Sequence, residues 1–368
     1  MAPSSDSPPV TDAESWAVDR AISLPEVWAL ITTFSGLVGA WRLLGVCRVA
    51  RAGAEEFLGT LPRLVVCGGH SWGVGQSSEV WGLDLVTMRW EAMPALVCAR
   101  SRHACCAVRG VLVVMGGMVS GSGIHRGPTP TTSRVEMLSQ GAGAFVELPP
   151  LSCGAIFDAV AIAVDETHSA LGQVLLLGGS TQDRTATSSV RLVDLATGVC
   201  TPQADLLHAR SLFAAVRLPD GGIVCAGGNS GLSTAEIWEQ PVQGAVNAAC
   251  MWRELPGMGV GRDGCGGCVL GDDRFAILGG RSKFTYTVTS LCEASTLCDD
   301  ENWSPLSPMH DPRCSFACTA VAGCIIVAGG DPEGKSAEVY DDMLDRWLRL
   351  PHDLPHDGGL SLMGSALL

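Results

Sequence analysis

Six Gly-Gly doublets, each at the end of a short apolar run, recur along this chain of 368 residues. The doublets end at Gly69, Gly117, Gly179, Gly228, Gly280 and Gly330. Successive doublets are 48, 62, 49, 52 and 50 residues apart, a range in which each repeat is one supersecondary unit that buries its apolar face only against its neighbours. The sequence therefore predicts one large repeat domain over residues 58–368.

Within each unit the same pieces follow in the same order: apolar run, doublet, variable loop, second strand, large residue and, in most units, arginine. The large residues are Trp90, Phe145, Cys200, Trp252, Trp303 and Trp347. Ten residues after each of them stand Arg100, Ala155, Arg210, Arg262, Arg313 and Asp357. We expect the variable interval to be a surface loop, because loops absorb insertions at little cost.

Each unit supplies four short apolar runs separated by Gly, Pro and Asp, which is typical of antiparallel strands. The run after each arginine is rich in small residues, as in HACCAV and FACTAV. Small side chains suit the innermost strand of a propeller blade, which lies crowded against the central axis. The pattern predicts an all-β fold built from four-stranded antiparallel blades.

The doublet, the tryptophan and the downstream arginine resemble the kelch repeat. In that family a Tyr stands seven residues before the Trp, and Tyr340 before Trp347 keeps this spacing. Leu83 and Val193 hold the same position in the first and third units. The resemblance implies a six-bladed kelch-type β-propeller.

The count of strands predicts how the ring closes. The first unit begins at its Gly-Gly strand and lacks an inner strand, whereas GGLSLMGSALL follows the last tryptophan without a unit of its own. We expect residues 360–368 to pair beside residues 61–67, because this pairing removes the exposed edge of an open array.

The composition disfavours several classes of partner. With 38 acidic and 24 basic residues the formal net charge is −14, which argues against nucleic acid and anionic membranes. The apolar stretch at residues 27–41 is shorter than the roughly 20 residues that a membrane span needs. The 16 cysteines follow no secretory signal, so we expect free thiols and a cytoplasmic or nuclear protein.

Residues 1–57 differ in character from the repeats. The first 21 residues are small, polar and Pro-rich, and we expect a flexible tail there. Residues 22–57 show helical periodicity without a doublet, with Pro25 near the expected helix start. This segment resembles an F-box, the helical module by which substrate receptors dock onto the small adaptor of cullin-based ubiquitin ligases.

The F-box resemblance implies a set of adaptor-binding residues. They are Leu24, Pro25, Leu30, Ile31, Phe34, Leu44, Val46 and Cys47. The family's usual Trp after Val-Cys-Arg is Ala50 here. F-box and kelch repeats are frequently joined, so the resemblance implies a substrate-recognition subunit. The alternative is a scaffold in which the helices only cap the propeller.

The loop face around the central channel is the recurrent binding site of a propeller. In kelch proteins it carries the turn with the repeated arginine and the loop after the doublet. These positions hold Arg100, Arg102, Arg210, Arg262, Arg313, His70, Asn229, Arg281, Lys283 and Asp331. They predict a local basic ring that binds a protein or an acidic peptide through charge-assisted contacts.

The arginines of this ring fall into two groups. Arg100, Arg210, Arg262 and Arg313 follow the repeat, which favours a structural role in which each satisfies loop carbonyls. Arg102 and Arg281 lie outside the repeat and are the better candidates for ligand contact.

No metal, cofactor or catalytic residue is expected. Cysteines at 105, 106, 265, 268, 314 and 318 lie on expected inner strands, where small side chains pack. Kelch-type copper radical oxidases need Tyr and His ligands, and the sequence holds only Tyr286 and Tyr340. Neither a nucleophile elbow nor a phosphate loop occurs. We therefore expect a binding protein; a small-molecule or sugar-modifying propeller enzyme is the alternative from another class.

Overall fold

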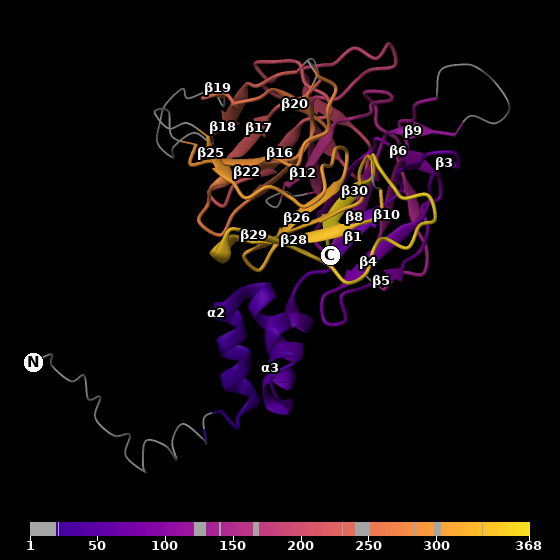
Figure 1. Ribbon diagram of the computed structural model, residues 1–368. Helices are drawn as coiled ribbons and strands as arrows, with labels where there is room; N and C mark the ends of the chain where they lie inside the picture. Colours follow the sequence, from indigo (N-terminus) through magenta and orange to yellow (C-terminus); the bar gives the residue numbers. More distant parts are fainter. Residues whose placement is uncertain are drawn as a thin grey trace, which may run out of the picture. The chain divides into compact units, whose positions relative to one another are not determined.

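Every Gly-Gly doublet ends the second strand of a four-stranded antiparallel sheet, and six such sheets form the blades of a β-propeller (Figure 1). The structure is a computed structural model that describes residues 20, 22–120, 130–139, 141–164, 169–229, 231–239, 251–282, 285–297, 303–332 and 334–368. The expected fold class, a six-bladed propeller preceded by a small helical segment, is confirmed. The chain divides into two compact units, of which the first ends at Leu61 and the second spans Pro62–Leu368.

The blades are numbered in chain order, and each is given from its inner to its outer strand. Blades 1 to 3 are β30 (Gly364–Leu367), β1 (Leu64–Cys67), β4 (Val80–Asp84), β5 (Arg89–Ala92); β7 (Ala104–Val108), β8 (Val111–Met115), β10 (Val135–Leu138), β11 (Val146–Leu148); and β12 (Val160–Val164), β13 (Gln173–Leu177), β14 (Val190–Asp194), β15 (Cys200–Pro202). Blades 4 to 6 are β16 (Ala214–Arg217), β17 (Ile223–Ala226), β18 (Ala235–Trp238), β19 (Trp252–Leu255); β21 (Gly266–Val269), β22 (Phe275–Leu278), β24 (Cys292–Ser295), β25 (Ser304–Leu306); and β26 (Ala317–Val321), β27 (Cys324–Ala328), β28 (Ala337–Asp341), β29 (Arg346–Arg349).

Short two-stranded ribbons lie on one face of the ring. They are β2 (His70–Ser71) with β3 (Gly75–Gln76), β6 (Arg100–Ser101) with β9 (Met118–Val119), and β20 (Arg262–Asp263) with β23 (Arg281–Ser282). A 3₁₀ turn, η1 (Asp342–Leu344), joins β28 to β29.

The doublets are glycine because the chain leaves each second strand with positive φ at both residues. At Gly178 and Gly179 the φ angles are 54° and 96°. A Cβ at Gly178 would lie 2.6 Å from the carbonyl oxygen of Arg210, and one at Gly179 would lie 2.7 Å from Cβ of Ala159. Glycine lets the backbone pass this close to the next blade at Gly178 and to the start of the inner strand of its own blade at Gly179.

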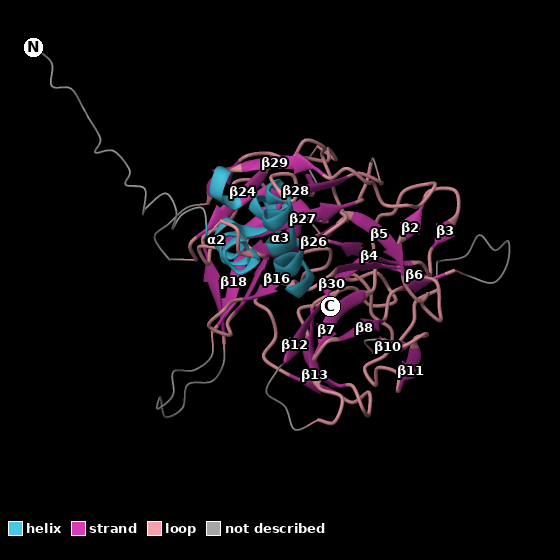
Figure 2. Ribbon diagram, turned by 90° about the horizontal axis from the view of Figure 1, so that it is seen from below, coloured by secondary structure: helices cyan, strands magenta, loops and turns pink. Residues whose placement is uncertain are grey.

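The C-terminal strand closes the ring as expected. Strand β30 pairs antiparallel with β1, with Leu64 opposite Leu367 and Cys67 opposite Gly364. The inner strands contact one another in the order β30, β7, β12, β16, β21, β26 and back to β30. Figure 2 shows the sheets arranged around a common axis. The last strand thus covers an edge that would otherwise be exposed.

A closed ring of backbone hydrogen bonds joins the six blades on the ribbon-bearing face. One residue just before each inner strand has a positive φ of 55–61°, and its N–H donates to the carbonyl of the equivalent residue in the preceding blade. The six residues are Arg102, Asp158, Leu212, Gly264, Ser315 and Leu362, with N···O distances of 2.7–3.2 Å. The ring fixes these residues as the floor of that face.

The tryptophans of the outer strands also connect neighbouring blades. Indole N–H groups of Trp252, Trp303 and Trp347 donate to backbone carbonyls of the preceding blade at 2.8–3.0 Å. Trp90 does the same toward the carbonyl of His352, across the junction between blades 6 and 1, at 3.2 Å. The repeated tryptophan therefore supplies a hydrogen bond as well as apolar surface.

The N-terminal unit contains two helices within its described residues, α2 (Pro25–Leu43) and α3 (Arg48–Thr60). Helix α2 is kinked at Gly36, and α3 presents small buried residues at Ala50, Gly53 and Ala54. A Cβ at Gly53 would lie 2.6 Å from the Pro25 carbonyl oxygen, so glycine lets the helices pack closely. Among the described residues no helix is long and apolar enough to cross a membrane.

Candidate functional site

A polar cavity of about 480 Å³ opens on the ribbon-bearing face of the propeller. Its floor is the hydrogen-bonded ring, and its wall holds the first residue after every Gly-Gly doublet: His70, Met118, Ser180, Asn229, Arg281 and Asp331. The structure thus brings five predicted binding residues together, namely His70, Arg102, Asn229, Arg281 and Asp331. Met118 and Ser180 hold the same repeat position and were not among the predicted residues. Lys283 lies outside the described residues.

Arg102 and Arg281 are each held by a carboxylate that lies beneath them. Nη1 of Arg102 lies 2.7 Å from Oδ2 of Asp158, and Nη2 of Arg281 lies 3.1 Å from Oδ1 of Asp263. The arginine side chains are 30% and 43% exposed, whereas Asp158 and Asp263 are only 3% and 11% exposed. The ring is therefore not purely basic, but the guanidinium groups are the parts of these pairs that a ligand meets.

Asp158 is a functional candidate that the sequence analysis missed, because a single acid in the degenerate second unit gives no pattern. Burial raises the pKa of its carboxyl to about 6; the neighbouring Arg102 opposes this shift and Asp263 adds to it. Its Oδ1 is buried and has no hydrogen-bond partner. The cavity floor thus contains a carboxylate that is costly to ionise.

From the raised pKa of Asp158 we predict how the free energy of unfolding depends on pH. Because the pKa of Asp158 is higher in the folded state than its ordinary 3.8, the folded protein binds more protons in this window, and stability falls as pH rises through it. Between about pH 4.5 and about pH 7.5, the parent should lose about 2 kcal/mol more free energy of unfolding than Asp158→Asn does. Urea unfolding at both pH values measures this, and parallel losses in the two proteins would contradict it.

An exposed tryptophan stands at the rim of the cavity. Trp72, in the turn between β2 and β3, is 75% exposed, and its indole N–H donates to Oδ1 of Asp331 at 2.9 Å. Its ring meets that of His70 edge-on, with centroids 5.4 Å apart. Arg184 also lines the cavity and makes no ion pair with another described residue. An aromatic anchor beside free donors is a common composition of protein-binding hot spots.

The four repeated arginines do not reach this cavity, and the prediction that they contact a partner is wrong. Arg100, Arg210, Arg262 and Arg313 are 0–3% exposed. Each donates to the carbonyl of the first glycine of the doublet that follows it in the chain and pairs with a glutamate on the third strand of the same blade: Glu136, Glu236, Glu293 and Glu338. The four repeated arginines therefore have the structural role that their place in the repeat favoured, in which each satisfies loop carbonyls.

The ten-residue offset fails in two units because their loops are longer. The carbonyl that accepts from the second glycine of each doublet belongs to Arg100, Arg210, Arg262 and Arg313 in four cases, and to Ile156 and Leu360 in the others. Ile156 and Leu360, rather than Ala155 and Asp357, thus occupy the arginine position. In those blades Arg191 and Trp81 replace the glutamate. Arginine and glutamate are present or absent together.

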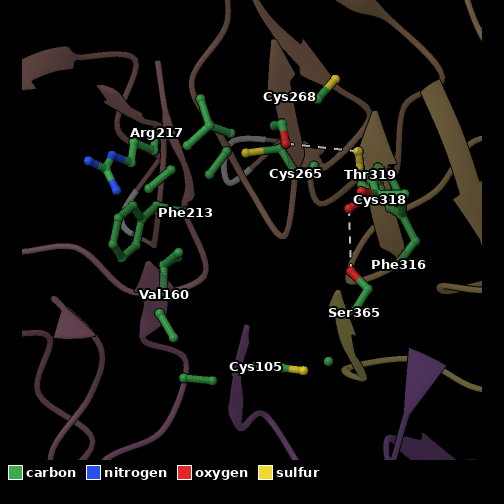
Figure 3. Close-up of a pocket in the computed structure, with 18 of the residues that line it drawn as sticks. Cys105, Val160, Phe213, Arg217, Cys265, Cys268, Phe316, Cys318, Thr319 and Ser365 are labelled. Atoms are coloured by element: carbon green, nitrogen blue, oxygen red, sulfur yellow. Dashed lines mark hydrogen bonds between the residues drawn. The ribbon is translucent and has the colours of Figure 1, made fainter. Parts of the chain in front are cut away.

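A second cavity of about 470 Å³ lies in the central channel, on the other side of the hydrogen-bonded ring. Small residues of the inner strands line it together with Cys105, Cys265, Cys268 and Cys318 (Figure 3). The described cysteines are all free thiols. Among the described residues no three His, Cys, Asp or Glu side chains form a group suited to a metal ion.

The predicted adaptor-binding residues lie on α2 with its N-cap, and in the turn that leads to α3. Leu24, Leu30, Ile31, Phe34 and Val46 are 39–77% exposed, an unusual degree for large apolar side chains. Cys47 is also exposed, whereas Pro25 and Leu44 are half-buried. Ala50, at the position of the family's Trp, is fully buried.

Comparison with known proteins agrees with this architecture. Residues 99–152 match the kelch motif, so the chain contains a kelch motif within a six-bladed propeller. An F-box/kelch-repeat protein of Arabidopsis thaliana is 46% identical over 56 residues, which are 14% of this chain and 15% of that protein. The structure of YjhT is similar with a TM-score of 0.61 and 13% identity over 79% of this chain and 98% of that chain, a likeness of fold alone.

Proposed function

We propose that the propeller binds an acidic segment of a partner protein in the polar cavity. The observation that carries this proposal is the pair of guanidinium groups of Arg102 and Arg281, each oriented by a nearly buried aspartate and each partly exposed in the same cavity. Arg102 uses only Nη1 toward Asp158, and Arg281 uses Nε and Nη2 toward Asp263, among the described residues. The remaining N–H groups can donate to ligand carboxylates.

The arrangement favours an anion over a cation. The carboxylates of Asp158 and Asp263 lie underneath the arginines, so an ammonium or guanidinium ligand would meet like charge first. Arg184 at the rim adds a third exposed cation. Trp72 supplies apolar surface for a neighbouring side chain of the partner. An acidic peptide with an apolar residue matches this set of groups.

Removal of the two guanidinium groups should abolish this binding without unfolding the protein. An array of immobilised peptides rich in Glu and Asp, paired with copies in which Lys replaces each acid, gives the readout. We expect the parent to bind acidic peptides only, and Arg102→Gln with Arg281→Gln to bind them at least about tenfold more weakly. Arg134→Gln, which changes an arginine that is 55% exposed elsewhere, is the matched control. Equal binding by parent and double variant at unchanged Tm would contradict the proposal.

We further propose that the helical unit docks onto the small adaptor of a cullin-type ubiquitin ligase, which makes the chain a substrate-recognition subunit. The supporting observation is the exposed apolar set of Leu24, Leu30, Ile31, Phe34 and Val46. Exposed apolar residues that gather on a small helical unit mark an interaction surface. The short match to an F-box/kelch-repeat protein points in the same direction. Such a receptor acts in the cytoplasm or the nucleus.

Two other functions agree less well with these residues. In a scaffold, the helices would only cap the propeller, and their apolar residues would then be covered by this chain itself. A propeller enzyme would need an acid and a base that converge on a substrate. Asp158 has a suitably raised pKa, but its side chain is only 3% exposed, which favours an orienting role for it. We propose a protein that acts by binding and leaves catalysis to other subunits.

A further inference from the structure

Two cysteines meet at the interface between blades 1 and 2, beside the closing strand β30. Cys67 lies on β1 of blade 1, and Cys105 lies on β7 of blade 2. Their sulfur atoms are 3.6 Å apart, and Nε2 of His103 is also 3.6 Å from the sulfur of Cys67. Gly364 of the closing strand lies between them, and a Cβ there would come within 2.5 Å of Cβ of Cys105. Only a glycine at this position leaves room for the two thiols to touch.

The contact changes the acidity of both thiols. Hydrogen bonding from Cys105, with further help from His103 and Arg100, lowers the pKa of Cys67 to about 6 against the effect of burial. The pKa of Cys105 rises because its proton is held by Cys67. Near neutral pH the two sulfurs therefore share one proton, with the negative charge on Cys67.

Of the two cysteines, Cys105 lines a cavity and Cys67 does not. Cys105 and His103 line the cavity in the central channel, and Figure 3 shows the Cys105 side chain at this cavity. Cys67 is fully buried behind them. Cys106, next in sequence, does not line the channel, and burial raises its pKa to about 12. A small polar oxidant in the channel thus reaches Cys105, whose sulfur lies 3.6 Å from the Cys67 thiolate.

We propose that Cys67 and Cys105 are a redox site at which peroxide forms a disulfide between blades 1 and 2. The Cys105 sulfur attacks one peroxide oxygen and passes its proton to the Cys67 thiolate; an S–O bond forms, the O–O bond breaks and hydroxide leaves. The Cys67 thiol then attacks the sulfenic sulfur of Cys105; the S–S bond forms, the S–O bond breaks, and the departing hydroxide takes the Cys67 proton as water. Both sulfurs are oxidised by one electron each, and hydrogen peroxide is reduced to water and hydroxide.

The disulfide would join the closing blade to its neighbour covalently. Cys67 and Cys105 are 38 residues apart, and the link would span a junction otherwise held by noncovalent interactions, among them the packing of β30 against β7 and the backbone hydrogen bond from Arg102 to Leu362. A cross-link of this kind removes conformational freedom from the unfolded chain, so the oxidised propeller should melt at a higher temperature.

The test treats the full chain with hydrogen peroxide, alkylates the remaining thiols and digests with trypsin. We expect a linked pair of peptides, residues 64–89 and 103–109, lighter by two hydrogen atoms than their sum. Because the second peptide holds Cys105 and Cys106, the two single variants decide between them. Cys105→Ser should lose the link, and Cys106→Ser should keep it.

The readout is the linked peptide rather than the total thiol count, because Cys153 with Cys200 and Cys268 with Cys318 are hydrogen-bonded pairs as well. Both serine variants change one atom, and circular dichroism before oxidation confirms that they fold. Oxidation of Cys105 to a sulfinic acid without the link would overturn the proposal, as would a link that persists in Cys105→Ser.

Discussion

Deletion of residues 361–368 should abolish the cooperative unfolding transition of the propeller. The deletion removes β30, which leaves every backbone group on one side of β1 without its partner. It also removes Leu362, so the ring of six backbone hydrogen bonds loses the bond that Leu362 donates to Ser315 and the one it accepts from Arg102. An open array of blades exposes two sheet edges and the apolar faces between them. Differential scanning calorimetry measures the effect.

A point substitution in the same strand is the matched control. Ser365→Ala removes only the side-chain bond from Ser365 to the carbonyl of Cys318, at 3.3 Å, and should leave Tm nearly unchanged. A truncated protein that melts cooperatively near the parent's Tm would show that ring closure does not hold the domain together.

Breaking one of the buried arginine–glutamate pairs should be the most destabilising single substitution in the blades. Arg210 and Glu236 are both fully buried, and Nε of Arg210 lies 2.6 Å from Oε1 of Glu236. Arg210→Met leaves the glutamate charge buried and also strips the bonds to the Gly227 and Thr234 carbonyls. We expect a loss of about 3–5 kcal/mol in the free energy of unfolding.

Two further variants separate charge burial from packing. Arg210→Met combined with Glu236→Gln should lose less stability than the single variant, because no uncompensated charge remains. Arg134→Met breaks the pair with Glu147, whose side chains are 55% and 48% exposed, and should cost less than about 1 kcal/mol. Urea unfolding of the three variants gives the comparison. Equal costs for Arg210→Met and Arg134→Met would contradict the structural role of the buried pair.

The propeller could be predicted from sequence because its strongest constraint is local. Both residues of each doublet have positive φ, a backbone conformation that favours glycine, so the doublet recurs wherever the chain makes this turn after a second strand. The closing strand was predictable for a similar reason, since the number of strands did not match the number of units. Neither inference needs a contact between distant residues.

The role of the repeated arginines required the structure. Their glutamate partners lie 25 to 36 residues away, across a loop whose length differs in each unit. The interval after the large residue is longer in two units, which places Ile156 and Leu360 at the equivalent position, so the fixed offset pointed to the wrong residues. A search for glutamate at the second position of the third strand would have found the pairing.

The cavity was predictable in part. The position after each doublet placed His70, Asn229, Arg281 and Asp331 on one wall, because repeats put equivalent residues on the same face. Asp158 could not be found, since it belongs to the unit that departs most from the pattern. Asp158 orients Arg102 because its carboxylate is buried beneath the guanidinium group, and the burial of a single residue cannot be read from the neighbouring sequence.

A bridging measurement tests the central claim that this chain links a partner protein to a ligase adaptor. Purified adaptor is immobilised, and a labelled acidic peptide selected on the array is added with the full chain. The account predicts that the chain retains the peptide on the adaptor. Phe34→Glu, which alters a side chain that is 77% exposed on α2, should lose chain and peptide together.

The cavity variant and a surface control complete this measurement. Arg102→Gln with Arg281→Gln should remain on the adaptor but release the peptide, and Met343→Glu, at a side chain that is 75% exposed on the propeller, should behave like the parent. Retention of the peptide by all four proteins, or failure of the parent to bind the adaptor at all, would contradict the account.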